Sequence, residues 1–177
     1  MKVFGFAGWS GSGKTTLLKQ LIPILVDRDL KVSTLKHAHH KFDVDKPGKD
    51  SYEHREAGAS EVMIASGNRW ALMHELRDEK EPSLKELIPH MTPVDILLIE
   101  GFKKEGHQKL EIYRSSLGKR MLHKDDPNII AIATDVTTDE TLATSSLPIL
   151  DLNDIETIAD FICKICGFDD SIRKAAD

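Results

Sequence analysis

The sequence predicts an α/β fold with a mostly parallel sheet, flanking helices and a β-hairpin insertion. First, an apolar run over residues 2–7 leads into a glycine-rich loop and then an amphipathic helical pattern. Second, later apolar runs end in polar or acidic residues, as buried parallel strands do at the carboxyl edge of a sheet. We find no internal repeat, low-complexity tract or linker, so we expect a single domain over residues 1–177 with frayed final residues.

Composition narrows the function classes. The chain has 24 Lys and Arg against 29 Asp and Glu, a net charge of −5. This balance argues against general nucleic-acid binding, which needs a basic face. No apolar run reaches the ~18 residues of a membrane span, and Lys2 leads directly into a strand without a signal peptide. We therefore expect a cytoplasmic protein with no nucleic-acid or membrane partner.

The glycine-rich loop carries the strongest motif. Residues 8–15 match G-x-x-x-x-G-K-[ST] at every fixed position, which predicts a phosphate-binding loop and the phosphate-loop NTPase fold. Glycines allow backbone N–H groups to converge on a phosphate, and the following helix adds its dipole. Lys14 supplies charge for the outer phosphates, and the Thr15 hydroxyl suits a bound Mg²⁺. The predicted loop residues are Gly8, Trp9, Ser10, Gly11, Ser12, Gly13, Lys14 and Thr15.

The segments that follow extend the α/β pattern. Apolar positions 17, 18, 21, 22 and 25 share one helical face, and Pro23 should bend that helix. Leu30–Lys36 predicts a second strand that neighbours the first. Polar residues after it should lie at the ligand edge of the sheet.

Histidines and aspartates follow this second strand. His37, His39 and His40 invite a metal interpretation, yet adjacent histidines diverge in an extended chain and no cysteine is near. We favour a polar loop that contacts nucleotide or partner. Asp43, Asp45 and Asp50 suit Mg²⁺ better, directly or through water, although a solvated acidic loop fits any one of them equally.

The middle of the chain predicts short elements. Pro47–Gly48 indicates a turn, and Asp50 or Ser51 should cap a helix over 52–57 that stops at Gly58. Runs at 61–66 and 69–74 around Gly67-Asn68 predict a β-hairpin. Such a hairpin is able to form a sheet edge that a second subunit closes. Ser83 should cap a helix over 84–90.

Val94–Glu100 predicts a central buried strand with an acid at its carboxyl end. We expect Glu100 to orient the Mg²⁺ shell beside the glycine loop, whereas Asp95 should lie at the opposite edge. A salt bridge at the strand end is the alternative role for Glu100. Lys103 and Lys104 in the next loop are either solvated or meet phosphate across an interface.

The last third predicts three more strands and a closing helix. Lys109–Arg114 alternates like a strand with one wet face, 128–135 reads as a buried strand, and 148–151 as a short one. Asp135 is able to accept the paired N–H donors of guanine, or to serve only as a turn residue. The helix over 155–166 holds Cys163 and Cys166, which we interpret as buried, inert thiols rather than a redox or metal pair.

Several segments together resemble the molybdopterin-guanine dinucleotide biosynthesis adaptor family, MobB. The resemblance spans nearly the whole chain. It implies GTP binding with weak Mg²⁺-dependent GTPase activity and homodimers whose sheets associate through exchanged strands. It also implies association with the guanylyltransferase that joins GMP to molybdopterin, and with other molybdenum-cofactor proteins. The guanylyl transfer itself belongs to that partner. The segments that carry it are Ala7–Thr16, Lys36–His40, Asp43–Ser51, Arg69–Met73, Glu100–Lys103 and Ala133–Asp135.

The resemblance also implies roles for individual residues. Residues 8–16, which include Thr16, would hold phosphates, and Lys14 and Glu100 would be the catalytic groups. Asp45 would join Thr15 and Glu100 around Mg²⁺. Thr134 and Asp135 would lie near the base, although the usual Asn-Lys-x-Asp guanine motif is absent. The cleft that holds the nucleotide would also be lined by Gly48 and by residues 36–40, among them Lys36.

Three alternatives remain open. A small-molecule phosphate-loop kinase needs an acceptor pocket and an arginine-bearing lid, and Arg69, Arg77 and Arg114 are too scattered to identify one. A metal-delivery GTPase is suggested by the histidines and cysteines, and a structural partner with a vestigial loop is the third. We expect slow hydrolysis, since no catalytic arginine or glutamine is evident near the phosphates.

Overall fold

A computed structural model describes residues 1–38, 42–138, 140–142 and 145–168. The chain divides into two compact units. The main unit comprises Met1–His37 and Thr92–Asp177, and the second comprises Ala38–Met91. Each unit is described by itself.

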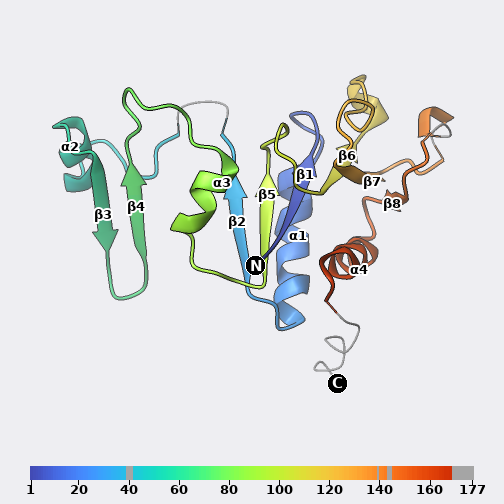
Figure 1. Cartoon of the computed structure of the whole chain (residues 1–177), viewed down its shortest axis with the longest axis horizontal. Helices are drawn as coiled ribbons and strands as arrows, with labels where there is room; N and C mark the ends of the chain where they lie inside the picture. The colour runs from blue at the N-terminus through green and yellow to red at the C-terminus, as the bar shows by residue number, and fades with distance from the viewer. Residues whose placement is uncertain (39–41, 139, 143–144, 169–177) are drawn as a thin grey trace. The chain divides into compact units, whose positions relative to one another are not determined.

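The main unit contains a six-stranded sheet in the order β2-β5-β1-β6-β7-β8 (Figure 1). Every neighbouring pair in this sheet is parallel. The predicted fold class, a mostly parallel sheet flanked by helices, is therefore confirmed. The strands are β1 (Lys2–Ala7), β2 (Val32–Lys36), β5 (Ile96–Glu100), β6 (Lys109–Tyr113), β7 (Ile129–Thr134) and β8 (Ile149–Asp151).

The expectation that the second strand neighbours the first is wrong, because β5 lies between β2 and β1. The burial of the strands explains the order. The four apolar residues of β5 are buried on both faces, whereas β2 is partly exposed along its length and suits the edge. Glu100 at the end of β5 is in register with Lys36 on one side and Phe6 on the other.

The expectation of a wet face on β6 is also wrong. All five of its residues are buried, Lys109 and Glu111 included, because β6 lies between β1 and β7. The charged groups find partners inside: Lys109 Nζ lies 3.0 Å from Asp126 Oδ2. The Glu111 carboxylate accepts hydrogen bonds from the backbone N–H groups of Leu122 and His123. Partnered charges allow an alternating strand to be buried on both faces.

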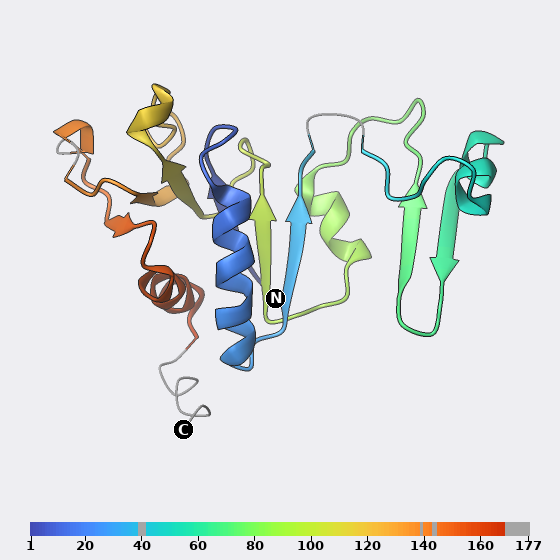
Figure 2. The same cartoon turned by 180° about the vertical axis from the view of Figure 1, so that it is seen from behind.

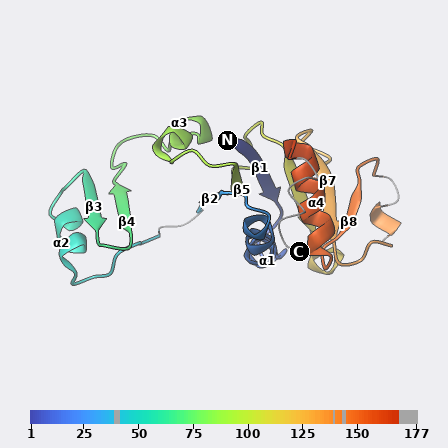
Figure 3. The same ribbon diagram turned by 90° about the horizontal axis from the view of Figure 1, so that it is seen from below.

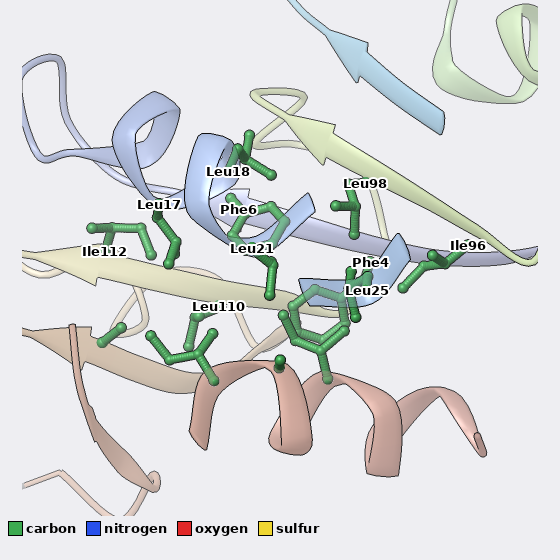
Figure 4. Packing of buried hydrophobic residues seen from close by; sticks show 14 of the residues in the cluster. Phe4, Phe6, Leu17, Leu18, Leu21, Leu25, Ile96, Leu98, Leu110 and Ile112 are labelled. Carbon is green, nitrogen blue, oxygen red and sulfur yellow. The ribbon is translucent and has the colours of Figure 1, made fainter. Parts of the chain in front are cut away.

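Two helices cover one face of the sheet. α1 (Lys14–Asp27) lies along the strands (Figure 2), and α4 (Ile155–Cys166) lies beside it (Figure 3). Their apolar faces pack with β1, β5 and β6 into one core (Figure 4). Pro23 lies inside α1 and removes one backbone donor without ending the helix. The core thus holds the β1–α1 connection at the carboxyl end of the sheet.

The closing helix α4 matches its predicted bounds. The Asp154 side chain caps its first turn by accepting from Thr157 N. Cys163 and Cys166 are free thiols: Cys166 is buried as predicted, and burial raises the pKa of its thiol to about 11, whereas Cys163 is only partly buried, contrary to the prediction. A thiol held in the neutral form is a poor nucleophile and metal ligand, in line with an inert role. The described residues of the main unit also form the short 3₁₀ turns η2 (Ser115–Leu117) and η3 (Glu140–Leu142).

The second unit contains the predicted hairpin, formed by antiparallel β3 (Glu61–Ala65) and β4 (Trp70–His74). The hairpin is its own two-stranded sheet, so the expectation that it edges the main sheet is wrong. Ser83 caps α3 (Leu84–Leu87) as predicted, in a capping box with Glu86, but the α-helix ends three residues earlier than predicted. The described part of this unit also contains α2 (Asp50–Glu56) and the 3₁₀ turn η1 (Ile88–His90).

The α2 cap differs from the prediction by one position. Lys49 precedes the helix and makes no side-chain cap, while Asp50 lies in the first turn, where its charge favours the helix dipole. Among the described residues, no helix is long and apolar enough to cross a membrane.

Candidate functional site

The glycine loop, residues 8–13, connects β1 to α1 at the carboxyl end of β1. A Cβ at Gly8 would lie 2.7 Å from the carbonyl oxygen of Ile112, so only glycine fits against neighbouring β6. Ser12 is buried, and its hydroxyl has no hydrogen-bond partner among the described residues. Ser10, Gly11 and Thr16 are exposed, so the loop presents several predicted residues to solvent.

Lys14 reaches back over the glycine loop. Its ammonium donates to the carbonyl oxygens of Gly8 and Trp9, each at 3.0 Å. Burial lowers the pKa of Lys14, and repulsion from Lys103 and Lys36 lowers it further, against the attraction of Glu100. Lys14 thus has two further cations and one carboxylate near it, a balance that favours an anionic ligand at this loop.

Thr15 and Glu100 meet as the sequence predicts. The Thr15 hydroxyl donates to the Glu100 carboxylate, at 3.1 Å from Oε1 and 3.3 Å from Oε2. Lys36 Nζ lies 3.7 Å from Glu100 Oε2. The meeting follows from the strand order, since β5 is the direct neighbour of β1. Hydroxyl and carboxylate oxygens are the donors that Mg²⁺ prefers, so this pair fits that ion.

Asp45 and Gly48 belong to the second unit, where Asp45 has a local partner. Arg55 Nη2 donates to Asp45 Oδ1 at 3.1 Å and to Asp43 Oδ1 at 3.0 Å. Gly48 has a φ of 80°, and Lys49 N donates to Lys46 O at 3.2 Å, which confirms the predicted turn. The predicted roles of Asp45 at Mg²⁺ and of Gly48 in the cleft stay predictions.

Trp9 is the aromatic residue of the glycine loop. Its indole Nε1 donates to the carbonyl oxygen of Arg120 at 2.7 Å. Lys103 Nζ lies 5.0 Å, and Lys119 Nζ 6.0 Å, from the ring centroid. Lys103 therefore approaches the loop within its own chain, and these contacts surround the loop with further positive charge.

Arg114 is the site residue that sequence reasoning missed. It follows β6, its Nε donates to Ser12 O at 3.1 Å, and its Nη1 pairs with Asp135. The sequence showed no evident catalytic arginine near the phosphates, and the structure places Arg114 beside the glycine loop with its guanidinium engaged by Ser12 and Asp135. One signal was available: Arg114 ends a predicted strand, at the edge where parallel strands present their ligand residues.

The two residues predicted near the base lie at the end of β7. Thr134 is buried, and its hydroxyl accepts from Val136 N at 3.3 Å. Asp135 follows it, and its carboxylate is held by Arg114. The structure thus brings Asp135 toward the glycine loop through an ion pair.

Of the three histidines singled out in the sequence, His37 lies within the described residues. The His37 ring packs against Phe102, with centroids 4.7 Å apart. His39 and His40 lie outside the described residues. Within the described part of the chain, no three or more His, Cys, Asp or Glu side chains gather as a metal site.

Fold and site together define the class of protein. A parallel sheet whose first strand leads through a glycine loop into a helix, with Lys14 over the loop and Glu100 on the neighbouring strand, is the phosphate-loop NTPase architecture. Residues 3–135 match the family described as "MobB: Molybdopterin guanine dinucleotide synthesis protein B". The chain belongs to this family.

Individual relatives agree. The chain is 47% identical over 163 residues to the molybdopterin-guanine dinucleotide biosynthesis adapter protein of Escherichia coli (strain K12), covering 90% of each chain. It is 44% identical over 164 residues to the adapter protein of that name in Haemophilus influenzae, covering 90% of this chain and 86% of the relative. A crystal structure of Bacillus subtilis MobB superposes with a TM-score of 0.70 at 26% identity, covering 93% of this chain and 97% of that one.

Proposed function

We propose that this chain is a GTP-binding adaptor in the biosynthesis of molybdopterin guanine dinucleotide. Its family and the adapter proteins of Escherichia coli and Haemophilus influenzae support the pathway. In this proposal the chain assists a guanylyltransferase, and the guanylyl transfer belongs to that partner. Contacts with other molybdenum-cofactor proteins and a cytoplasmic location stay predictions.

The arrangement of Lys14, Thr15 and Glu100 carries the nucleotide part of the proposal. Lys14 places a positive charge over the glycine loop, where two backbone carbonyls now hold it. A triphosphate would take the ammonium from those carbonyls, because the ammonium binds a negatively charged phosphate oxygen more strongly than a neutral carbonyl oxygen. Thr15 and Glu100 would hold Mg²⁺, which supplies charge neutralisation for the phosphates when bound.

Weak hydrolysis is the second part of the proposal. Phosphoryl transfer is accelerated by an arginine that stabilises charge on the transferring group. Arg114 is the arginine beside the glycine loop, but Ser12 and Asp135 already engage its guanidinium. With that guanidinium held, stabilisation of the phosphates would fall to Lys14, the loop N–H groups and the bound Mg²⁺, which favours slow turnover.

A homodimer is the third part. Met63, Leu72 and Trp70 lie on one face of the hairpin, because Met63 pairs with Leu72 and Trp70 with Ala65. These three side chains are 62%, 42% and 62% exposed. Adjacent exposed apolar residues mark an interaction surface. A second copy that covers this face would remove these apolar side chains from water.

Calorimetric titration tests the nucleotide proposal. GTP and ATP, each with Mg²⁺, are titrated into the wild type, Lys14→Ala and Lys19→Ala. Lys19 is an exposed lysine of α1 outside the glycine loop and is the matched control for the charge change. We expect GTP to bind more tightly than ATP, Lys14→Ala to lose at least tenfold in affinity, and Lys19→Ala to behave as wild type.

The other outcomes are equally informative. Preference for ATP would favour the small-molecule kinase alternative. Equal loss in both lysine variants would show that net charge, and not the position of Lys14, governs binding. Multiple turnovers of GTP by the isolated protein at a rate typical of enzymes would contradict the adaptor proposal.

A further inference from the structure

Arg114 is separated from the glycine loop by about a hundred residues in sequence and yet borders it directly. β6 is the neighbour of β1, with Ala7 in register with Glu111, so the end of β6 reaches the loop that follows β1. Arg114 Nε donates to the carbonyl oxygen of Ser12 at 3.1 Å. A Cβ at Gly13 would lie 3.6 Å from Arg114 Nη2, and one at Gly11 would lie 3.9 Å from Leu117. The segment after β6 therefore packs against the loop.

The hydrogen bond to Ser12 has a geometric consequence. The peptide bond between Ser12 and Gly13 is planar and trans, so its C=O and N–H point in opposite directions. Because Arg114 holds the Ser12 carbonyl, the Gly13 N–H is directed away from the guanidinium. A phosphate loop binds its ligand through such N–H groups. Arg114 thus holds the direction of one phosphate donor.

Asp135 completes the arrangement. Its carboxylate pairs with Arg114 Nη1 while Nε of the same guanidinium donates to Ser12. A guanidinium is planar and rigid, so a carboxylate that holds one nitrogen also orients the other. The end of β7 is in this way connected to the glycine loop through one side chain.

We propose that Arg114 is a positioning residue of the glycine loop, and that Asp135 serves the loop by orienting Arg114. The inference rests on the proposed nucleotide binding and adds a second role for the acid at the end of β7. In this role Asp135 governs affinity for the phosphates. An Asp135 that reads guanine would instead govern the choice of base.

A comparison between tripolyphosphate, which has no base, and nucleotides that differ in their base separates these two roles. Calorimetry measures the affinity for four ligands, each with Mg²⁺: tripolyphosphate, GTP, XTP and ATP. The proteins compared are the wild type, Arg114→Lys, Arg114→Gln, Asp135→Asn and the double variant Arg114→Gln/Asp135→Asn. Arg120→Gln and Asp125→Asn are the controls, because they break an exposed pair of the same chemistry and keep the Arg120 carbonyl that accepts from Trp9. Thermal unfolding of each variant confirms that it is folded.

We expect Arg114→Lys and Arg114→Gln to weaken tripolyphosphate and GTP by the same factor, about tenfold. Lysine keeps the charge but lacks the fork that holds both partners, so it should not rescue. Asp135→Asn should weaken both ligands and leave the ratios of GTP to XTP and ATP unchanged. The double variant should lose no more affinity than the weaker-binding single variant, since both changes break the same connection from Asp135 through Arg114 to Ser12.

Several results would overturn the inference. Rescue by Arg114→Lys would reduce the role of Arg114 to its charge. Asp135→Asn that keeps tripolyphosphate affinity and shifts preference from GTP to XTP would assign Asp135 to the base. Tighter tripolyphosphate binding by Asp135→Asn would show that the carboxylate withholds Arg114 from phosphate. A wild type that binds neither GTP nor tripolyphosphate would overturn the proposed function, and this inference with it.

Discussion

Thr15 Oγ1 lies 3.1 Å from Glu100 Oε1, although 85 residues separate the two in sequence. The first turn of α1 and the end of β5 are brought together because β5 is the strand beside β1. The hydroxyl donates to the carboxylate here. A cation between the two oxygens would receive electron pairs from both, so this contact is the framework of the proposed Mg²⁺ site.

Glu100→Gln should therefore remove the contribution of Mg²⁺ to GTP binding. We expect about tenfold weaker GTP binding with Mg²⁺, and unchanged or tighter binding in EDTA because a negative charge beside the phosphates is lost. Calorimetry in the two conditions checks this. Asp95→Asn is the control at the opposite end of the same strand, where an amide oxygen can still accept from Lys31 N. Equal losses with and without Mg²⁺ would argue for a purely structural Glu100.

The part of this site that the sequence predicts is local. The spacing from Gly8 to Thr15 defines the loop within eight residues, and an apolar run ending in Glu100 identifies the acid by its place on a strand. Both inferences depend on carboxyl ends of parallel strands lying at one edge of the sheet. That rule holds for any order of strands. The wrong expectation that β2 neighbours β1 therefore did not affect these two inferences.

The part that the sequence does not predict depends on the strand order. Arg114 contacts Ser12 only because β6 lies beside β1, and the contact spans 102 positions in the chain. Alternation along β6 likewise suggested a wet face, although Asp126 and the backbone of 122–123 satisfy Lys109 and Glu111 inside the protein. Such partners come from loops that no local pattern assigns to the strand.

The exposed face of the hairpin predicts a change in oligomeric state. Leu72 lies opposite Met63 in the β3–β4 pairing, and both are exposed. Leu72→Glu places a charge in the proposed interface, where burial without a partner is costly. We expect the wild type to sediment as a dimer and Leu72→Glu as a monomer in analytical ultracentrifugation. Asn68→Glu, in the exposed turn of the same hairpin, should remain dimeric. A monomeric wild type would contradict this prediction.

The ion pair between the buried Lys109 of β6 and Asp126 predicts that removing the Lys109 charge will destabilise the fold. Lys109 is buried, and its ammonium donates to Glu105 O and to Asp126 Oδ2. Burial disfavours the charged Asp126 carboxyl, yet hydrogen bonds from Lys109 and Asn128 hold the pKa of Asp126 below its usual value. Lys109→Met leaves the carboxylate without its main partner, so we expect a loss of about 2 kcal/mol in the free energy of unfolding.

Urea denaturation of Lys109→Met measures this loss. Lys104→Met, on the exposed loop before β6, is the control and should stay within about 0.5 kcal/mol of wild type. Asp126→Asn in the Lys109→Met background should recover part of the stability, because it removes the unpaired charge. A Lys109→Met protein as stable as wild type would show that the pair contributes nothing net.

The burial of His107 predicts how the free energy of unfolding depends on pH. Both ring nitrogens are buried without a hydrogen-bond partner among the described residues, and a Cβ at Gly5 would lie 2.3 Å from Nε2. Burial lowers the pKa of His107 to about 4, and the positive charge of Lys109 acts in the same direction, against Glu105 and Asp126. The ring is neutral in the folded protein at pH 7.

The sign of the effect follows from proton binding. The unfolded histidine titrates near its usual pKa of 6.5, so between about pH 6.5 and pH 4 the unfolded chain binds more protons than the folded one. The free energy of unfolding therefore falls as the pH is lowered through this window. Allowing for the partial exposure of the ring, we expect His107 to account for about 1 kcal/mol of the loss between pH 7 and pH 5.

Urea denaturation of the wild type and His107→Leu at pH 7, 6 and 5 tests this dependence. The variant cannot bind the proton, so its free energy of unfolding should fall less steeply with acid, even if its stability at pH 7 differs from wild type. His54→Leu, which replaces an exposed histidine of the second unit, is the matched control for the loss of a histidine. Parallel pH curves for the wild type and His107→Leu would mean that the folded protein accommodates a charged His107, and that the packing against Gly5 does not exclude the proton.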